Sequence, residues 1–121
     1  MASANKTVVV TGASSGIGLA VVEAYVKQGY NVVGNARTLS HLQKVAERLG
    51  SKFVPVDGDI SKKATAQRVF DTAIAQFGQV DILVNNAGIF VAKPFAAYTE
   101  EDIESVFDTN LKGVIYITQL V

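Results

Sequence analysis

The apolar residues of the chain fall into short runs separated by longer amphipathic segments. The first run, residues 7–11, is β-branched throughout and too short for a helix. A run without polar alternation is typical of a strand buried on both faces of a parallel sheet. Similar runs predict strands at 31–34, 53–56 and 80–84. Pro55 favours an edge position for the third strand, because proline has no N–H to donate to the ladder.

Between these runs, apolar residues recur with the spacing of helices. The expected inward stripes are, in chain order, Ile17, Ala20, Val21, Ala24 and Val26; Leu42, Val45, Ala46 and Leu49; Ala66, Val69, Phe70, Ala73 and Ile74; and Ile103, Val106, Phe107, Val114 and Thr118. Ser61 is the expected N-cap of the third helix, and Thr99 with Asp102 suits a capping box before the last. The alternation predicts an α/β fold with a doubly wound parallel sheet of about four strands, in the order 3-2-1-4.

Composition restricts the possible partners. The chain has 121 residues, of which 49% are hydrophobic and 18% charged, so residues 1–121 are expected to form one globular domain. Its net charge of zero gives no general attraction to nucleic acid or to an anionic membrane, so neither is expected as a partner. The lack of cysteine and the single histidine exclude thiol chemistry and make a metal site unexpected. The segment before the first predicted strand, residues 1–6, is short and polar. We therefore expect that the chain has no signal peptide and that it is cytoplasmic.

A glycine-rich turn follows the first predicted strand directly. Residues 11–18 read Thr-Gly-Ala-Ser-Ser-Gly-Ile-Gly, and a helical pattern begins at their end. We expect Gly12 to form the tight turn, Gly16 to leave backbone open for a pyrophosphate, and Gly18 to bring the helix close to the strand. The free N–H groups at the start of the helix would face the phosphates. This predicts a Rossmann-type dinucleotide site, with a glycine-rich turn that holds no ligand as the alternative.

Four motifs in order resemble those of the short-chain dehydrogenases/reductases. They are the glycine turn at 11–18, Asp59-Ile60 after the third strand, Asn85-Asn86-Ala87-Gly88 after the fourth, and Asn110 within residues 108–113. The resemblance covers essentially the whole chain. It implies an NAD(P)-dependent oxidoreductase that interconverts a small carbonyl compound and its alcohol. The residues that it implies for cofactor binding are Gly12, Ser14, Ser15, Gly16, Ile17 and Gly18 in the turn, Asp59 and Ile60 at the adenine, and Asn86, Ala87 and Gly88 at the ribose and the central strand.

The polar residues of these motifs also stand out without the family. Asp59 and Asn86 follow predicted strands, where open parallel sheets bind ligands, although an Asx turn is the alternative for each. Asn110 lies in the apolar stripe of the last helix, so we expect a buried amide that needs hydrogen-bond partners. A purely structural amide is the alternative. The resemblance implies that Asn110 has a catalytic role, organising a water linked to proton relay.

The end of the second strand indicates which cofactor is bound. By resemblance, members that prefer NAD carry an acidic residue where this chain has Ala36, followed by Arg37 and Thr38. A guanidinium can hold a 2′-phosphate through charge-assisted bonds, so we expect NADP, with NAD as second choice and with Arg37 and Thr38 in the site. Ser15 departs from this pattern, because many NADP-dependent relatives carry a basic residue there. A solvated surface charge is the alternative for Arg37.

The catalytic residues of the family have no match here. The family uses a serine and a tyrosine with a lysine four residues later, but the residues four after the tyrosines are Gly29, Gly34, Asp102 and Leu120. The chain also ends within an apolar helical pattern. We therefore expect the amino-terminal half of a larger single-domain reductase, inactive alone. The alternative is a non-catalytic dinucleotide-binding or interaction module. Apolar residues on the other sides of the last helix predict a homo-oligomer: Leu111, Ile115, Leu120 and Val121.

Overall fold

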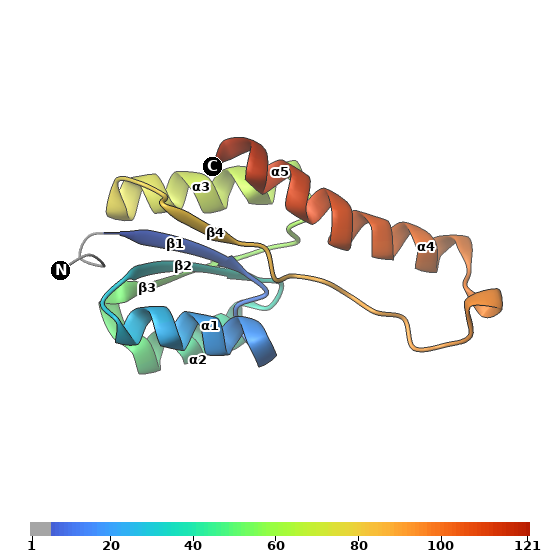
Figure 1. Cartoon of the computed structure of the whole chain (residues 1–121), viewed down its shortest axis with the longest axis horizontal. Coiled ribbons are helices and arrows are strands. Elements are labelled where there is room, and N and C mark those ends of the chain that lie inside the picture. Colours follow the sequence, from blue (N-terminus) through green and yellow to red (C-terminus); the bar gives the residue numbers. More distant parts are fainter. Residues whose placement is uncertain (1–5) are drawn as a thin grey trace.

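The computed structural model describes residues 6–121. The prediction that the chain has no signal peptide rested on residues 1–6, most of which lie outside the described residues. Its centre is a parallel sheet of four strands, shown in Figure 1. The strands are β1 (Thr7–Thr11), β2 (Asn31–Ala36), β3 (Phe53–Asp57) and β4 (Ile82–Val84), in the order β3-β2-β1-β4. This confirms the predicted fold class and order, and it places the strand that contains Pro55 at an edge.

Helices cover both faces of the sheet. Figure 1 shows α1 (Gly16–Lys27) and α2 (Leu39–Leu49) on one face, and α3 (Lys63–Phe77) and α5 (Gly113–Leu120) on the other. The alternation of side chains along β1 supplies both layers, because Val8 and Val10 pack with the first pair of helices and Val9 with the second. All three valines are 0% exposed. The run of unbroken apolar residues therefore has the two-sided burial that the sequence predicts.

Beyond β4 the chain leaves this body, which consists of one sheet between two layers of helices, and it returns to the body at α5. Residues 90–107, here called the arm, consist of an extended loop, a short 3-10 helix at Phe95–Ala97 and α4 (Glu100–Phe107), and Figure 1 shows them projecting from the body. The predicted capping box is present at Thr99 and Asp102, with N···O distances of 2.9 and 3.1 Å. A single turn of π-helix, η3 (Asp108–Lys112), joins α4 to α5.

Four details of the predicted helices are wrong. In α1, Ile17 is 76% exposed, and Gly18 and Val22 are the buried residues. The inward face is set by the close contact between Gly18 and the backbone of Gly12 in the turn, which only a residue without a side chain permits, and not by the largest apolar residues. The second error concerns Ser61, which does not cap α3. The N-cap is Lys62, while the Ser61 hydroxyl donates to Asp59.

The stripe predicted for the last helix is also wrong. Ile103 is 40% and Phe107 58% exposed, whereas the buried residues are Thr109, Gly113 and Ile117. The helix approaches Ile60 so closely that a Cβ added to Gly113 would lie 2.8 Å from its Cγ2 atom. Small residues therefore occupy the inward face at this point. In α3, Ile74 was likewise expected inward but is 41% exposed.

Candidate functional site

A cavity of about 270 Å³ lies at the carboxyl ends of the strands. Open parallel sheets bind ligands at this edge, next to the start of the helix that follows the first strand. Eight of the predicted site residues line it: Gly12, Ser14, Ser15, Arg37, Thr38, Ile60, Ala87 and Gly88. Five further lining residues were not among the predicted site residues: Asn35, Ala36, Gly58, Ile89 and Thr109.

The glycine turn shapes one wall of the cavity. Gly12 and Gly16 have φ values of 66° and 56°, a conformation that side-chain-bearing residues rarely adopt. A Cβ on Gly18 would lie 1.9 Å from the carbonyl oxygen of Gly12, so Gly18 makes the close contact between helix and turn possible. Gly16, Ile17 and Gly18 do not themselves line the cavity. They form the first turn of α1, whose backbone N–H groups have no partner within the helix and can hold an anion.

Thr11 and Asn86 join the glycine turn to the loop after β4. The Thr11 hydroxyl accepts hydrogen bonds from the backbone N–H groups of Asn86 and Ala87, at 3.1 and 2.9 Å. The Asn86 amide donates to the carbonyl oxygen of Gly12 at 3.2 Å. Asn86 thus holds two walls of the cavity together, and Ala87 and Gly88 lie at its surface.

Asp59 forms a tight turn after β3. Its Oδ1 atom accepts hydrogen bonds from the backbone N–H and the hydroxyl of Ser61, at 2.9 and 2.7 Å. Burial raises the pKa of Asp59, but these two bonds and the charges of Arg37 and Lys62 outweigh it, so the pKa lies below its ordinary value. The carboxylate is therefore ionised at neutral pH. Asp59 does not line the cavity, whereas Ile60 does and is only 3% exposed.

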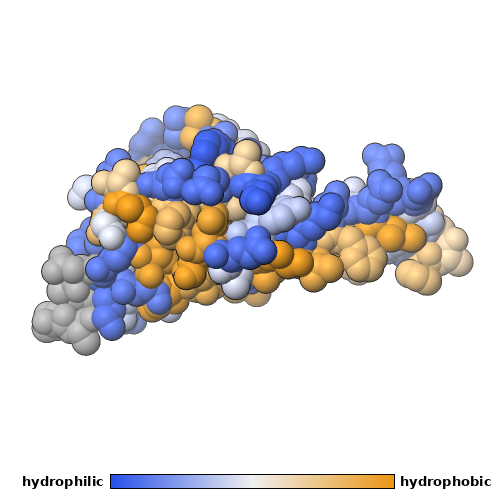
Figure 2. All heavy atoms as spheres, turned by 90° about the horizontal axis from the view of Figure 1, so that it is seen from above, coloured by the Kyte–Doolittle hydropathy of each residue, from blue (hydrophilic) through white to orange (hydrophobic). Residues whose placement is uncertain are grey.

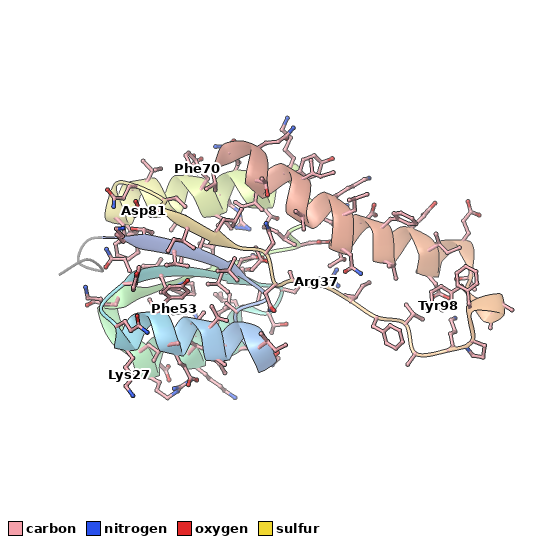
Figure 3. The ribbon with its side chains drawn as sticks, in the orientation of Figure 1. Lys27, Arg37, Phe53, Phe70, Asp81 and Tyr98 are labelled. Atoms are coloured by element: carbon pink, nitrogen blue, oxygen red, sulfur yellow. The ribbon has the colours of Figure 1, made fainter. Side chains whose placement is uncertain are left out.

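Arg37 follows β2 at the rim of the cavity, and Figure 3 shows it where the ends of the strands meet the chain that leads to the arm. Its Nη2 atom donates to the hydroxyl of Thr109 at 3.1 Å and lies 3.8 Å from Oδ1 of Asp59. The Arg37 side chain is 60% exposed. The preceding residue, Ala36, carries no charge, so the guanidinium is the charged group that β2 brings to the cavity.

Asn110 differs from its prediction in burial but not in its need for partners. The residue is exposed, and Thr109 before it is buried. Its Oδ1 accepts from the N–H of Ile89 at 2.8 Å, and its Nδ2 donates to the carbonyl oxygen of the same residue at 3.0 Å. This pair of bonds fixes the loop after Gly88 against η3. Asn110 does not line the cavity.

Sequence reasoning missed Asn35 and Thr109. Asn35 is 1% exposed, and its Nδ2 donates to the carbonyl oxygens of Val56 and Gly58, at 2.9 and 3.2 Å. Its own carbonyl oxygen accepts from the N–H of Ala13 at 2.9 Å, so one residue ties three walls of the cavity together. An amide at the end of a β-branched strand is a sequence signal that could have identified it. For Thr109 the sequence offers only a weak indication, namely that it precedes Asn110.

The arrangement suits a ligand with an anionic part and a flat or sugar-like part. The start of α1 and the Arg37 guanidinium are the groups that would hold negative charge, and the hydroxyls of Ser14 and Ser15 add hydrogen-bond donors. Within residues 6–121, no group of three His, Cys, Asp or Glu side chains could hold a metal ion. No helix in that range is long and apolar enough to cross a membrane.

Comparison with known proteins agrees with this geometry. The chain is 39% identical over 118 residues to an uncharacterized oxidoreductase of Methylorubrum extorquens, covering 94% of this chain and 48% of that protein. It is 33% identical to an NADP-dependent 3-hydroxy acid dehydrogenase of Escherichia coli, covering 94% and 46%. A 3-ketoacyl-(acyl-carrier-protein) reductase of Brucella melitensis, solved in complex with NADH, superposes with a TM-score of 0.92 at 33% identity, covering 96% and 48%.

The chain thus spans about half the length of these relatives. The sequence model described as short chain dehydrogenase matches residues 6–121, which include the glycine turn, both polar strand ends and Asn110. The chain therefore belongs to the short-chain dehydrogenase family, and it corresponds to the amino-terminal half of that fold.

Proposed function

We propose that this chain binds NADP(H) in the cavity at the ends of the strands, as the cofactor-binding half of an oxidoreductase that interconverts a carbonyl compound and an alcohol. Membership of the family, and the similarity to a 3-hydroxy acid dehydrogenase, support the reaction class. When bound, the nicotinamide gives or accepts a hydride. In this chain the turn at Gly12 and the first N–H groups of α1 would hold the pyrophosphate. By the family resemblance Asp59 and Ile60 would contact the adenine, and of the two Ile60 lines the cavity in the free chain.

The position of Arg37 is the main support for NADP over NAD as the cofactor. Its guanidinium lies at the cavity rim, and the residue before it is the uncharged Ala36. An acidic side chain there would repel a 2′-phosphate, whereas a planar guanidinium can bind it through two parallel hydrogen bonds. Relatives and neighbours include an NADP-dependent enzyme and one solved with NADH, so family membership alone does not decide this point.

The 121-residue chain alone is proposed to bind cofactor without catalysing hydride transfer. Asn110 would organise a water for proton relay, but proton transfer to the substrate oxygen needs a positioned acid. No tyrosine of the chain has a lysine four residues later. The alternative remains a non-catalytic dinucleotide-binding or interaction module, which would bind cofactor equally well. Both proposals predict no carbonyl reduction by the chain alone, so the mass of the protein from its native source separates them. A longer protein would support the cofactor-binding half of a reductase, and a 121-residue protein would support the module.

We also propose self-association through the apolar side of the last helix. Three of the four residues behind the homo-oligomer prediction are exposed, Leu111, Ile115 and Val121, at 51%, 43% and 47%. The fourth, Leu120, is partly buried and packs against the core instead. Figure 2 shows apolar side chains gathered along one side of the projecting part of the molecule. Large exposed apolar patches usually mark interfaces. The cytoplasmic location stays a prediction from the sequence.

The cofactor proposal is tested by measuring dissociation constants for NADPH and NADH with wild-type chain and Arg37→Ala. Loss of one charge-assisted pair should weaken NADPH binding by about tenfold or more and leave NADH binding nearly unchanged. Arg48→Ala is the matched control, because Arg48 is similarly exposed and pairs with Glu23 on α1. Equal loss for both cofactors would assign Arg37 a structural role, and no loss would refute its role in cofactor choice.

A further inference from the structure

Within the described residues, Arg37 makes a side-chain hydrogen bond to one uncharged group, the hydroxyl of Thr109. Arg37 Nη2 donates to Thr109 Oγ1 at 3.1 Å. Thr109 is 5% exposed, while the Arg37 side chain is 60% exposed. A buried acceptor in the cavity wall thus holds the end of a long side chain that is otherwise largely in solvent.

This acceptor is itself held in place from both sides. Thr109 lies in the π-helical turn η3, and such turns occur often at functional sites. The next residue, Asn110, is fixed to the backbone of Ile89 by two hydrogen bonds, at 2.8 and 3.0 Å. Gly113, one helical turn further on, packs against Ile60. The backbone that carries Thr109 is therefore held in place independently of Arg37 and of any ligand.

The contact leaves Arg37 able to bind an anion. A guanidinium has five N–H donors in one plane, so a single bond to Thr109 leaves the others for a ligand. The competing partner is Asp59, but its Oδ1 lies 3.8 Å from Arg37 and already accepts two hydrogen bonds from Ser61. Ser61 thus engages the carboxylate that would otherwise draw the guanidinium away from the rim.

Preordering of this kind changes affinity. An exposed arginine occupies many rotamers, and a ligand that it contacts must restrict them at a cost in entropy. A bond that already restricts the side chain in the free protein removes part of this cost. A threonine with a fixed hydroxyl is suited to this task, because it accepts the bond without adding a charge that would repel a phosphate.

We propose that Thr109 is a positioning residue for cofactor choice: its hydroxyl holds Arg37 in the orientation that receives the 2′-phosphate of the adenosine ribose. This rests on the proposed function, in which Arg37 reads that phosphate. Thr109 does not touch the phosphate in this proposal but acts through Arg37. Its removal should therefore affect only ligands that carry a 2′-phosphate, and only when Arg37 is present.

The test uses small probes that isolate the adenosine end of the cofactor. Adenosine 2′,5′-bisphosphate and 5′-AMP are titrated calorimetrically into wild-type chain, Thr109→Val, Thr109→Ser, Arg37→Ala and the double variant Arg37→Ala/Thr109→Val. Thr109→Val should weaken binding of the bisphosphate by about two- to tenfold, the range expected for one hydrogen bond, and leave 5′-AMP binding unchanged. Thr109→Ser should restore wild-type affinity. In the Arg37→Ala background, Thr109→Val should have no further effect.

Controls separate this role from a structural one. Thr118→Val removes a hydroxyl from α5 that contacts Asn85 and not Arg37, and it should leave both affinities unchanged. If Thr109→Val does not fold, Thr109→Ala carries the same test, because it removes the hydroxyl without adding volume. An equal loss for both probes, or a loss that persists in the Arg37→Ala background, would overturn the inference.

The outcomes also distinguish this inference from the proposal beneath it. If wild-type chain binds both probes equally and Arg37→Ala changes neither, the role of Arg37 and the role of Thr109 are both refuted. If Arg37→Ala selectively weakens the bisphosphate but Thr109→Val and Thr109→Ala do not, only the role of Thr109 is refuted.

Discussion

The body and the arm of this molecule are built in different ways. In the body, Val8, Val9 and Val10 are 0% exposed and pack against helices on both faces of the sheet. In the arm, Phe90 and Phe95 are 84% and 82% exposed. Figures 1 and 2 show the arm projecting from the body with apolar side chains along one side. Burial on two sides stabilises the body, whereas the arm depends mainly on local contacts.

Those local contacts are specific even though few of them involve the body. The capping box at Thr99 and Asp102 begins α4, and Lys93 pairs with Asp102 at 2.5 Å. Tyr98 donates from its hydroxyl to the carbonyl oxygen of Val91 at 2.7 Å. Such contacts can define the path of a segment without adding much to global stability. The cavity lies on the body side of this division, so its shape rests on the buried core.

Removing an apolar side chain from each region should produce the largest difference between the body and the arm. Leu42→Ala deletes a side chain that is 0% exposed between α2 and the sheet, and it should lower the free energy of unfolding by about 2–5 kcal/mol. Phe107→Ala deletes a larger side chain that is 58% exposed at the end of the arm, and its effect should stay within about 0.5 kcal/mol.

Urea denaturation followed by circular dichroism measures both variants under one set of conditions. It should be done at low protein concentration, so that any self-association through the apolar side does not contribute. A loss for Phe107→Ala comparable to that for Leu42→Ala would contradict the division into a core-stabilised body and a locally stabilised arm.

The same division explains which features could be predicted from sequence. The strands were predicted from short apolar runs, of which β1 is buried along its whole length. The edge position of β3 follows from Pro55, and the order follows from the doubly wound fold class. The glycine turn could be predicted because its backbone requires glycine. A Cβ on Gly18, for example, would lie 1.9 Å from the carbonyl oxygen of Gly12. The capping box was predicted because it depends on only four consecutive residues.

The failures occur where tertiary contact overrides hydrophobicity. At Gly18 and Gly113 the closest contacts are made by glycine, so a stripe drawn through the large apolar residues points to the wrong face. Asn110 was expected to be buried for the same reason. Asn35 and Thr109 were missed because their roles depend on hydrogen bonds to residues 21 to 72 positions away, which no local pattern encodes.

A smaller effect on stability is expected at Asp59, in the turn after β3. Because the folded state lowers the pKa of Asp59, its contribution to stability is fully present above the ordinary carboxyl pKa of about 3.9 and is lost as pH falls through the lower folded value. The stability difference between wild-type chain and Asp59→Asn should therefore be constant near neutral pH and should shrink below about pH 4. Urea midpoints measured from pH 7 to pH 3 check this.

The variant Ser61→Ala extends that experiment. It removes one of the two hydrogen bonds that lower the pKa of Asp59, so the acid-dependent part of the difference should become smaller. A difference between wild-type chain and Asp59→Asn that does not change across the whole pH range would contradict the described environment of this carboxylate.

If the body alone holds the adenosine and phosphate part of the cofactor, NMR chemical-shift mapping should detect binding at the cavity and not in the arm. The isotope-labelled 121-residue chain is titrated with adenosine 2′,5′-bisphosphate, and backbone amide shifts are followed. We predict large changes at Gly12–Gly16, Arg37, Ile60 and Thr109, and none along α4. Changes centred on the arm, or spread without relation to the cavity, would contradict the account.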